Sequence, residues 1–415
     1  MKLSKFSIPF RKGEEGYIYN TTNGSILRYT KTGDHSLSLD KLSDKEAAFL
    51  LDQHVCVQSD EDDDHFVREK YTERLSSFDD VLYLTIEITT LCNFRCSFCY
   101  QASWDSRAKI KLSDIDKLVK ILNESDLSTY KRVSLNIIGG EPFLFPEIVH
   151  DCYSKLALFC DAKNLEFFCK LNSNGYNLTP EHLRSFHNME FMFPFLTKED
   201  YGSIVSLRSG EENLRQKLIS NVYSWVSVFN EDLSKRIIFR LNANERNVKK
   251  FKSYVREVVS FGFKNFGIAL INTGDCDFNN YRNLMSEDNF MKWYFLEAIP
   301  ILQSYNVSLP IFPRNSLSRC MARRKGSFKL FADGRIGLCN GVEYDEGLPH
   351  INDISNLDAI NNLFKEIKEF HYLLHDDKCK NCDKAFLCGG ASPCKGKICR
   401  GNIENVINYA VRIIK

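Results

Sequence analysis

The sequence predicts an α/β protein whose central part forms a full or partial barrel of parallel strands. Two observations support this. Between residues 80 and 310, short runs of alternating apolar residues are separated by helical stretches. Six such β-α units are typical of a parallel sheet that curls toward a barrel, with its chemistry at the carboxyl ends of the strands.

The strand candidates of this central part follow one another in order. The first contains Leu82, Leu84, Ile86 and Ile88 in alternation, and the others cover 133–138, 166–171, 191–196, 236–241 and 266–271. Helices are expected after Ser113, which is the predicted cap, and over 211–229 and 247–261. The resulting organisation has three parts, 1–79, 80–310 and 311–415.

Composition and charge exclude several classes of protein. The 415 residues include 55 Lys and Arg against 54 Asp and Glu, which argues against nucleic-acid binding by bulk charge. The sequence contains no run of about 18 apolar residues, so no membrane span is expected. The basic N-terminus lacks the apolar core of a secretory signal, so a cytoplasmic protein is expected.

The first part predicts a small α+β unit. Residues 16–19 and 26–29 flank a turn with Asn23 and Gly24, the pair that a tight hairpin favours. Ser43 and Glu46 form a predicted capping box at the start of a helix. The acidic run from Asp60 to Asp64 is expected to be a solvated loop.

The cysteines indicate metal binding. There are 15, an odd number in a chain without an export signal, which favours a reducing compartment and metal ligation over disulfides. Five are scattered and are expected to be small buried hydrophobes: Cys56, Cys152, Cys160, Cys169 and Cys276. The other ten fall in one group near residue 95 and another after residue 319.

The first group, Cys92, Cys96 and Cys99, follows the first strand with a CxxxCxxC spacing. Three thiolates on one loop can bind three irons of a cubane and leave the fourth iron open. A structural zinc site would need a fourth ligand, and neither His65 nor His150 lies in this loop. The spacing alone leaves both metals open.

The loop CNFRCSFCY, residues 92–100, resembles the signature of the radical S-adenosylmethionine (SAM) superfamily. Gly139-Gly140-Glu141-Pro142 resembles that family's motif for the SAM amino group. Ser173-Asn174-Gly175 resembles a further recurring element. The resemblance covers residues 82 to about 275 in the expected order, and it implies a partial (β/α)6 radical SAM barrel.

The resemblance also implies roles for individual residues. Cys92, Cys96 and Cys99 would hold a catalytic [4Fe–4S] cluster whose open iron chelates SAM, so that an electron from the cluster releases a 5′-deoxyadenosyl radical. Residues expected to contact SAM are Phe98, Gly139, Gly140, Glu141, Pro142, Ser173, Asn174, Arg208 and Leu270. One departure is Phe193-Pro194-Phe195, where related maturases often offer a serine.

The C-terminal cysteines resemble the SPASM domain of peptide-modifying radical SAM enzymes. Cys320, Gly334 and Cys339 match its start, and Cys379, Cys382 and Cys388 match its CxxCxxxxxC run. The interval from Cys388 to Cys394 is longer than usual. Two auxiliary [4Fe–4S] clusters are implied, with paired zinc sites as the alternative.

The family's connectivity implies which thiols belong together. Cys379, Cys382, Cys388 and Cys399 would ligate an outer cluster, and Cys320, Cys339 and Cys394 an inner one. The inner cluster is then short of one ligand, which suggests an open iron for a substrate thiolate. The N-terminal part resembles the winged-helix-like domain by which maturases bind a leader peptide, with a structural cap on the barrel as the alternative.

The resemblance thus implies an enzyme that modifies a ribosomally made precursor peptide with a leader sequence. It would form a thioether or carbon–carbon cross-link and draw electrons from a flavodoxin or ferredoxin. Three alternatives stay open: a sulfatase-maturase-like enzyme that makes formylglycine, a non-catalytic Fe–S scaffold that binds peptides, and a zinc-only protein.

Overall fold

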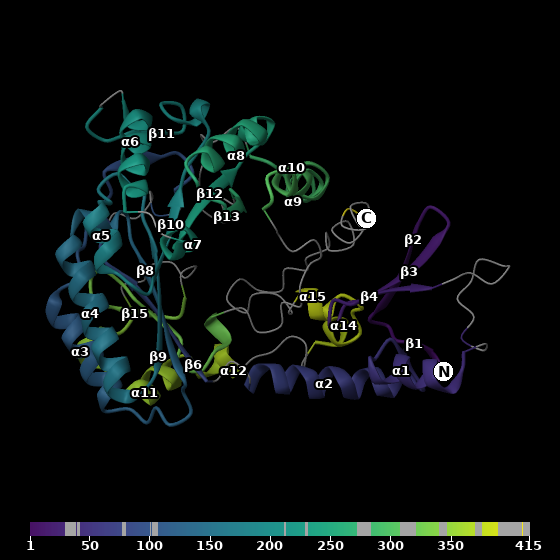
Figure 1. The fold of residues 1–415 in the computed structure, drawn as a ribbon. Helices are drawn as coiled ribbons and strands as arrows, with labels where there is room; N and C mark the ends of the chain where they lie inside the picture. Colours follow the sequence, from purple (N-terminus) through teal and green to yellow (C-terminus); the bar gives the residue numbers. More distant parts are fainter. Residues whose placement is uncertain are drawn as a thin grey trace.

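An eight-stranded sheet forms the centre of the molecule (Figure 1). Its order is β13 (Phe266–Leu270), β12 (Ile237–Ala243), β10 (Met189–Pro194), β9 (Glu166–Asn172), β8 (Arg132–Ile138), β6 (Val81–Glu87), β14 (Phe328–Leu330) and β15 (Ile336–Gly337). All neighbours are parallel except β14 and β15. Within the described residues β13 and β15 do not pair, so the sheet is open and the predicted α/β partial barrel is confirmed.

The computed structural model describes most of the chain. The residues described are 1–29, 39, 42–76, 80–99, 101, 107–210, 213–228, 231–271, 284–307, 321–339, 347–369, 376–388 and 409. Within them, every helix is too short or too polar to span a membrane.

Helices pack along the sheet because they carry apolar faces. The main ones are α3 (Leu112–Asn123), α4 (Pro146–Lys163), α5 (Pro180–Ser185), α6 (Leu214–Val226), α7 (Glu231–Arg236) and α8 (Phe251–Ser260). On α3, Ile115, Leu118 and Leu122 follow helical spacing and are fully buried. The same core contains alternate strand residues such as Leu135 and Phe239.

All six predicted strands of the central part are present within two residues of their expected limits. The predicted cap at Ser113 is wrong: α3 begins at Leu112, and Lys111 is its N-cap residue. Asp114 lies at the third helical position and accepts a hydrogen bond from the Lys111 backbone N–H at 3.3 Å. The helix therefore begins two residues earlier than a cap at Ser113 would require.

The N-terminal residues that the structure describes form two small sheets and two helices. β2 (Ser7–Lys12), β3 (Glu15–Asn20) and β4 (Ile26–Tyr29) are antiparallel, and the predicted hairpin turn places Gly24 at φ +78°. β1 (Lys2–Leu3) pairs with β5 (Cys56–Val57). The capping box of α1 (Asp44–Asp52) is confirmed by the Ser43 and Glu46 side chains.

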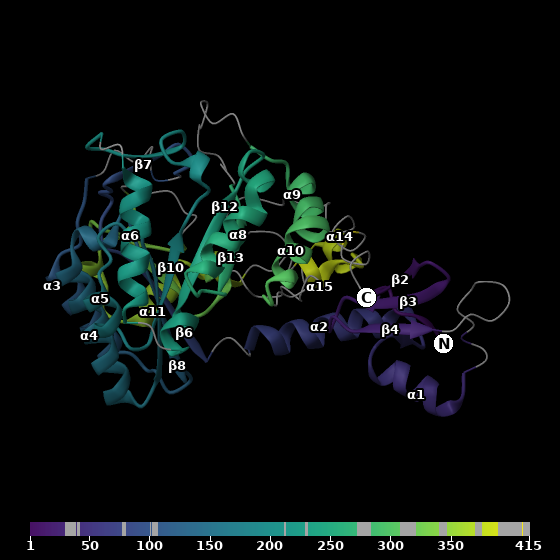
Figure 2. The ribbon, with the colours of Figure 1, turned by 45° about the horizontal axis from the view of Figure 1, so that its top comes forward.

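The expectation of a solvated loop at Asp60–Asp64 is wrong. These residues begin α2 (Asp60–Ser76), a long helix that runs from the N-terminal strands toward the central sheet (Figures 1 and 2). Acidic residues suit the first turn of a helix because they face its positive end. Asp63 is moreover buried, with 1% of its surface exposed.

The C-terminal part contributes more to the core than its cysteine-rich sequence suggested. β14 pairs with β6 in parallel, and Phe328, Leu330 and Ile336 belong to the main core. Further elements are η7 (Ile351–Asp353), α11 (Leu357–Leu363), α12 (Lys365–Glu369), α14 (Asp377–Lys380) and α15 (Ala385–Cys388). α9 (Glu287–Trp293), η5 (Tyr294–Ala298) and α10 (Ile299–Ser304) precede this part.

Candidate functional site

The three cysteines of the CxxxCxxC loop lie together at the carboxyl end of β6. Their loop is fixed by β7 (Phe94–Cys96), which pairs antiparallel with β11 (Val205–Leu207). The backbone N–H of Phe94 donates to the Cys92 sulfur at 3.3 Å, and that of Cys99 donates to the Cys96 carbonyl at 3.1 Å. All three cysteines line one cavity of about 500 Å³.

The carboxyl ends of the parallel strands supply the walls of this cavity. Six of the nine residues predicted to contact SAM line it: Phe98, Gly139, Gly140, Ser173, Asn174 and Leu270. They come from segments that are up to 172 residues apart, from Phe98 to Leu270. The shared edge of a parallel sheet brings them together.

The donor set fits an iron–sulfur cluster. Burial raises the pKa of the Cys92 thiol to about 11, and burial together with the neighbouring thiols raises that of Cys96. The thiolates therefore need a positively charged partner at neutral pH, as metal binding provides. Within the described residues no three His, Cys, Asp or Glu side chains converge on a single ion. Thiols spread around one cavity suit a cluster, in which each binds a different iron.

Glu141 lies beneath the cavity wall. It is fully buried and accepts hydrogen bonds from Ser173 Oγ at 2.8 Å, from the Asn174 backbone N–H at 2.6 Å and from that of Phe143 at 2.9 Å. Burial raises its pKa to about 7. The carboxylate thus ties the end of β8 to the end of β9, and its predicted contact with the SAM ammonium stays a prediction.

Asn174 extends this connection to the cysteine loop. Its side-chain amide Nδ2 donates to Asn93 Oδ1 at 2.8 Å and lies 3.9 Å from the Cys92 sulfur. Asn93 is the residue after Cys92. Hydrogen bonds therefore join three segments into one unit: the motif at 139–142, the motif at 173–175 and the cysteine loop.

The glycines of the Gly139-Gly140 pair allow two backbone segments to approach. A Cβ on Gly139 would lie 2.6 Å from the Thr89 carbonyl oxygen, and one on Gly140 would lie 2.8 Å from that of Thr90. The Gly140 N–H donates to the Thr89 carbonyl at 2.7 Å. The residues just before the cysteine loop would have to move to accept any side chain here.

Besides Glu141, two predicted SAM contacts lie outside the cavity lining, Pro142 and Arg208. Pro142 is buried at the start of the short helix η2 (Pro142–Leu144). Arg208 is exposed, and its Nε donates to the Phe94 carbonyl at 3.2 Å, so that it braces the cysteine loop from outside. A contact from either residue to SAM stays a prediction.

Several lining residues were not predicted. They are polar or aromatic side chains near strand ends or in adjacent loops: Gln101, Asn136, Asn172, Tyr201, Arg240 and Asn242. Asn136 with Ile138, and Arg240 with Asn242, are two residues apart on one strand, so both members of each pair face the interior. Polar residues at the inward positions of a strand end were the signal available in the sequence.

The C-terminal cysteines are described only in part. Cys339 is buried beside Ala322 and Leu338, and Cys379 and Cys382 are half-buried at α14 and just after it. Cys388 ends α15. Cys320, Cys394, Cys399 and the scattered Cys276 lie outside the described residues. The other scattered cysteines, Cys56, Cys152, Cys160 and Cys169, are buried as predicted.

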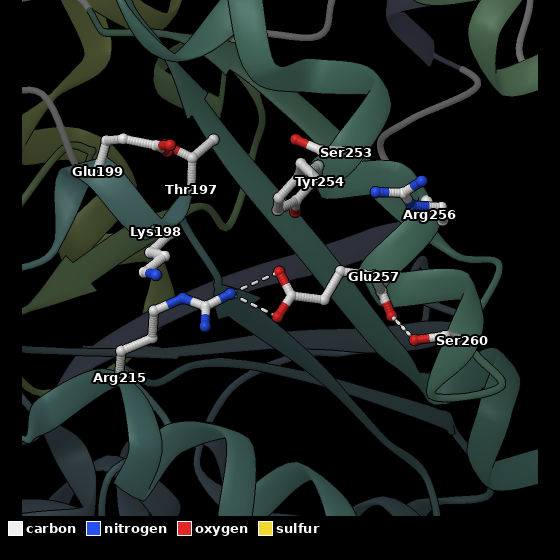
Figure 3. A pocket seen from close by; sticks show the side chains of 9 residues that line it. All are labelled: Thr197, Lys198, Glu199, Arg215, Ser253, Tyr254, Arg256, Glu257 and Ser260. Carbon is white, nitrogen blue, oxygen red and sulfur yellow. Dashed lines mark hydrogen bonds and ion pairs between the residues drawn. The ribbon is translucent and has the colours of Figure 1, made fainter.

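A second cavity, of about 520 Å³, lies between α6 and α8 and has no cysteine (Figure 3). Arg215 reaches across it and forms an ion pair with both oxygens of Glu257, the longer contact being 2.6 Å. Lys198 and Arg256 also line it. The ion pair joins two helices that cover the sheet, and the cavity lacks the ligands that a cluster needs.

Comparison with known proteins finds similarity in sequence over part of the chain. Residues 86–197 match the family model of the radical SAM superfamily. Over 76 residues the chain is 36% identical to the GTP 3′,8-cyclase of Vibrio atlanticus. The matched region covers 16% of this chain and 21% of that enzyme. The chain thus spans about a fifth of the length of this curated relative.

Solved structures share the fold over much more of the chain. A structure of native anSMEcpe with bound AdoMet and Kp18Cys peptide covers 80% of this chain and 100% of its own, with a TM-score of 0.59 and 18% identity. The structure of Streptococcus suis SuiB bound to precursor peptide SuiA matches 94% of this chain and 95% of its own chain, with a TM-score of 0.54 and 16% identity. Both are similar in fold.

Proposed function

We propose, from the premise that residues 86–197 form a radical SAM domain, that this chain is an enzyme that modifies a ribosomally made peptide. The observation that carries the proposal is the convergence of three thiols and two SAM-type motifs on one cavity. The radical SAM family implies one [4Fe–4S] cluster and SAM, and the donor set fits them.

The residues of the cavity have separable roles. Cys92, Cys96 and Cys99 would hold the cluster, which supplies the electron that cleaves SAM to a 5′-deoxyadenosyl radical. Gly139 and Gly140 shape the wall, and Glu141 holds the Ser173–Asn174 turn in place. Their shared task is to orient the ligand and to exclude water from a reactive site.

A peptide is the proposed substrate because two of the structures that are similar over most of the chain have a peptide bound. The spacing of the C-terminal cysteines favours auxiliary clusters as part of this proposal. Forming a cross-link removes two hydrogens from the peptide: the deoxyadenosyl group takes one as a hydrogen atom, and the second leaves as a proton and an electron. An auxiliary cluster would accept that electron, so we propose a thioether or carbon–carbon cross-link as the product.

The first experiment tests the radical chemistry. Anaerobically reconstituted protein is given dithionite and SAM, and 5′-deoxyadenosine is measured. Wild type and Cys152→Ala, a buried cysteine away from the cavity, should produce it, whereas Cys96→Ala should not. Absence of the product from fully loaded wild type would refute the proposal.

The second experiment tests the substrate. The chain is co-expressed with a short peptide encoded beside its gene, and the mass of the peptide is measured. A loss of two hydrogens with all sulfur retained supports cross-linking. Loss of the thiol sulfur from a cysteine would instead indicate formylglycine formation.

A further inference from the structure

The N-terminal unit, defined as residues 1–29 and 42–76, packs against the outer cysteine segment, residues 376–388. Phe6, Val67, Ala385 and Phe386 form one buried cluster with no more than 4% of any residue exposed. Cys379, Cys382 and Phe66 pack against the same cluster. In both ribbon views α14 and α15 lie beside the N-terminal strands (Figures 1 and 2).

Aromatic rings form the centre of this contact. Phe6 meets Phe386 edge to face at 4.9 Å between ring centroids, and Phe66 lies 6.0 Å from the same ring. Such pairs stabilise a contact beyond the effect of burial alone. A second contact brings the fully buried Tyr19 against Leu387, so three consecutive residues of α15, Ala385 to Leu387, contact the N-terminal unit.

A hydrogen bond fixes the register between the two segments. Thr21 is fully buried, and its hydroxyl donates to the Asp383 carbonyl at 3.1 Å. Asp383 directly follows Cys382. The N-terminal unit therefore holds the backbone of the cysteine segment as well as its apolar side chains.

The N-terminal side of the contact is itself held by one buried carboxylate. Asp63 accepts hydrogen bonds from Ser4 Oγ at 2.6 Å and from the Lys5 backbone N–H at 2.9 Å, and it lies 2.8 Å from His54 Nε2. The His54 ring stacks on Phe66 at 3.6 Å. This network fixes the backbone beside Phe6 and the ring of Phe66 at the contact with the cysteine segment.

The cysteine segment has the chemistry of a metal-binding turn. Cys379 and Cys382 are separated by one turn, and the Cys382 N–H donates to the Cys379 carbonyl at 3.3 Å. Both pack on the same apolar wall, so thiolates there would face a metal on one side and aromatic rings on the other. Apolar surroundings and solvent exposure tune the potential of iron–sulfur clusters.

We propose that the N-terminal unit forms one wall of the outer metal site: Phe6 and Phe66 shield the Cys379–Cys382 turn from water and stabilise the cluster that it holds. This proposal rests on the proposed function, because the outer cluster belongs to it. It means that the N-terminal unit acts on a redox centre as well as on any peptide it binds.

Two variants of the full-length chain test the wall, Phe6→Ala and Phe66→Ala. The matched control is Phe49→Ala, since Phe49 lies in the same unit but is 52% exposed. Iron content, release of iron to a chelator and the midpoint potential of each cluster are measured. We expect release from the outer cluster to be several-fold faster in both variants. Its potential should become more positive, because water stabilises the more negative reduced cluster.

The control and the cluster of the CxxxCxxC loop should match wild type. If Phe6→Ala and Phe66→Ala leave the outer cluster's iron release and potential unchanged, the proposal is overturned. If wild type itself contains no outer cluster, the auxiliary-cluster part of the proposed function fails instead, so the two failures are distinguishable by the iron content of wild type.

The reverse experiment does not depend on the folding of the aromatic variants. Stabilisation between two parts is reciprocal, so loss of the outer cluster should loosen the N-terminal unit. Hydrogen exchange at residues 1–29 and 54–67 is expected to be about tenfold faster in Cys379→Ser/Cys382→Ser. Cys96→Ala, which removes the cluster of the CxxxCxxC loop, should leave that exchange unchanged. Equal exchange in all three proteins would contradict the wall.

Discussion

Glu141 shows how one residue connects the motifs of the site. Its two oxygens accept three hydrogen bonds from residues 143, 173 and 174. A buried carboxylate with this many donors organises backbone that would otherwise leave polar groups unsatisfied. Gly139 and Gly140 of this motif therefore line the cavity, and the buried Glu141 holds other lining residues, Ser173 and Asn174, in place.

We predict that Glu141→Gln weakens SAM binding about tenfold, because an amide has one acceptor oxygen and must lose a donor such as the Asn174 N–H. Iron bound by the cysteine loop should be retained, since Glu141 is not among the residues that line the cavity. Equilibrium binding of SAM and iron content check this. Unchanged SAM affinity would show that the Ser173–Asn174 turn holds its place without the carboxylate.

The same residue predicts a pH dependence of stability. Burial raises the Glu141 pKa from 4.5 to about 7, so between these values the folded state binds more protons than the unfolded state. Stability should therefore fall as pH rises from about 4.5 to about 7, by about 3 kcal/mol from this group. Urea unfolding of metal-free wild type should show this slope, and Glu141→Gln should reduce it.

Gly140 gives a prediction about backbone approach. In Gly140→Ala the new Cβ would clash with the Thr90 and Leu91 carbonyl oxygens, so the residues before the cysteine loop must shift. We expect a lower Tm and loss of iron from that loop. The control is Gly267→Ala in β13, whose Cβ would meet its nearest atom at an ordinary 3.4 Å. A variant at Gly140 with normal iron content would contradict the prediction.

At the scale of elements, β14 is joined to β6 by a buried ion pair. Lys329 Nζ lies 3.2 Å from Glu87 Oε1, and the two residues are 0% and 1% exposed. Burial raises the pKa of Glu87 and lowers that of Lys329. Glu87 also accepts hydrogen bonds from the Gln101 side chain at 2.7 Å and from the Ala332 N–H at 3.3 Å. The pair thus links the C-terminal strand to a residue that lines the cavity.

Removing one partner of this pair should cost more than removing both. Lys329→Met leaves a buried carboxylate uncompensated, and we expect a loss of about 3–5 kcal/mol in the free energy of unfolding. The double variant Glu87→Gln/Lys329→Met should recover part of that loss. Denaturant unfolding of both measures it. Lys70→Met, which removes the exposed Lys70–Glu73 pair, should cost less than about 1 kcal/mol. Equal losses in the single and double variants would contradict the coupling.

Across the whole molecule, local sequence patterns predicted the strands and the position of the cavity. They did not predict the contacts between residues that are far apart in the sequence. Alternating apolar residues are visible in a short window, and parallel strands bring their carboxyl ends together whatever the connecting helices contain. The burial of Asp63 depends on Ser4 and Lys5, more than 55 residues away. The pairing of β14 with β6 places Lys329 opposite Thr85, 244 residues away, and the ion pair joins Lys329 to Glu87, 242 residues away. No local periodicity reports such contacts.

The two ends of the chain should therefore differ in their importance for SAM binding. Among the residues that the structure describes, those that line the cavity all lie between Cys92 and Ile271. A chain without residues 1–79 is therefore expected to bind SAM with an affinity within about threefold of the full-length value. A chain without residues 311–415 loses β14, which leaves an edge of β6 unpaired and Glu87 without Lys329.

We expect that second chain to lose SAM binding along with its stability, because Gln101 and the cysteine loop then depend on an unpaired, buried carboxylate. Calorimetric titration of both reconstituted proteins with SAM measures the difference, and the melting temperature shows whether each remains folded. SAM binding that is lost on N-terminal truncation, or kept on C-terminal truncation, would contradict this division. The first outcome would mean that the N-terminal residues support the cavity through contacts beyond the outer cysteine segment.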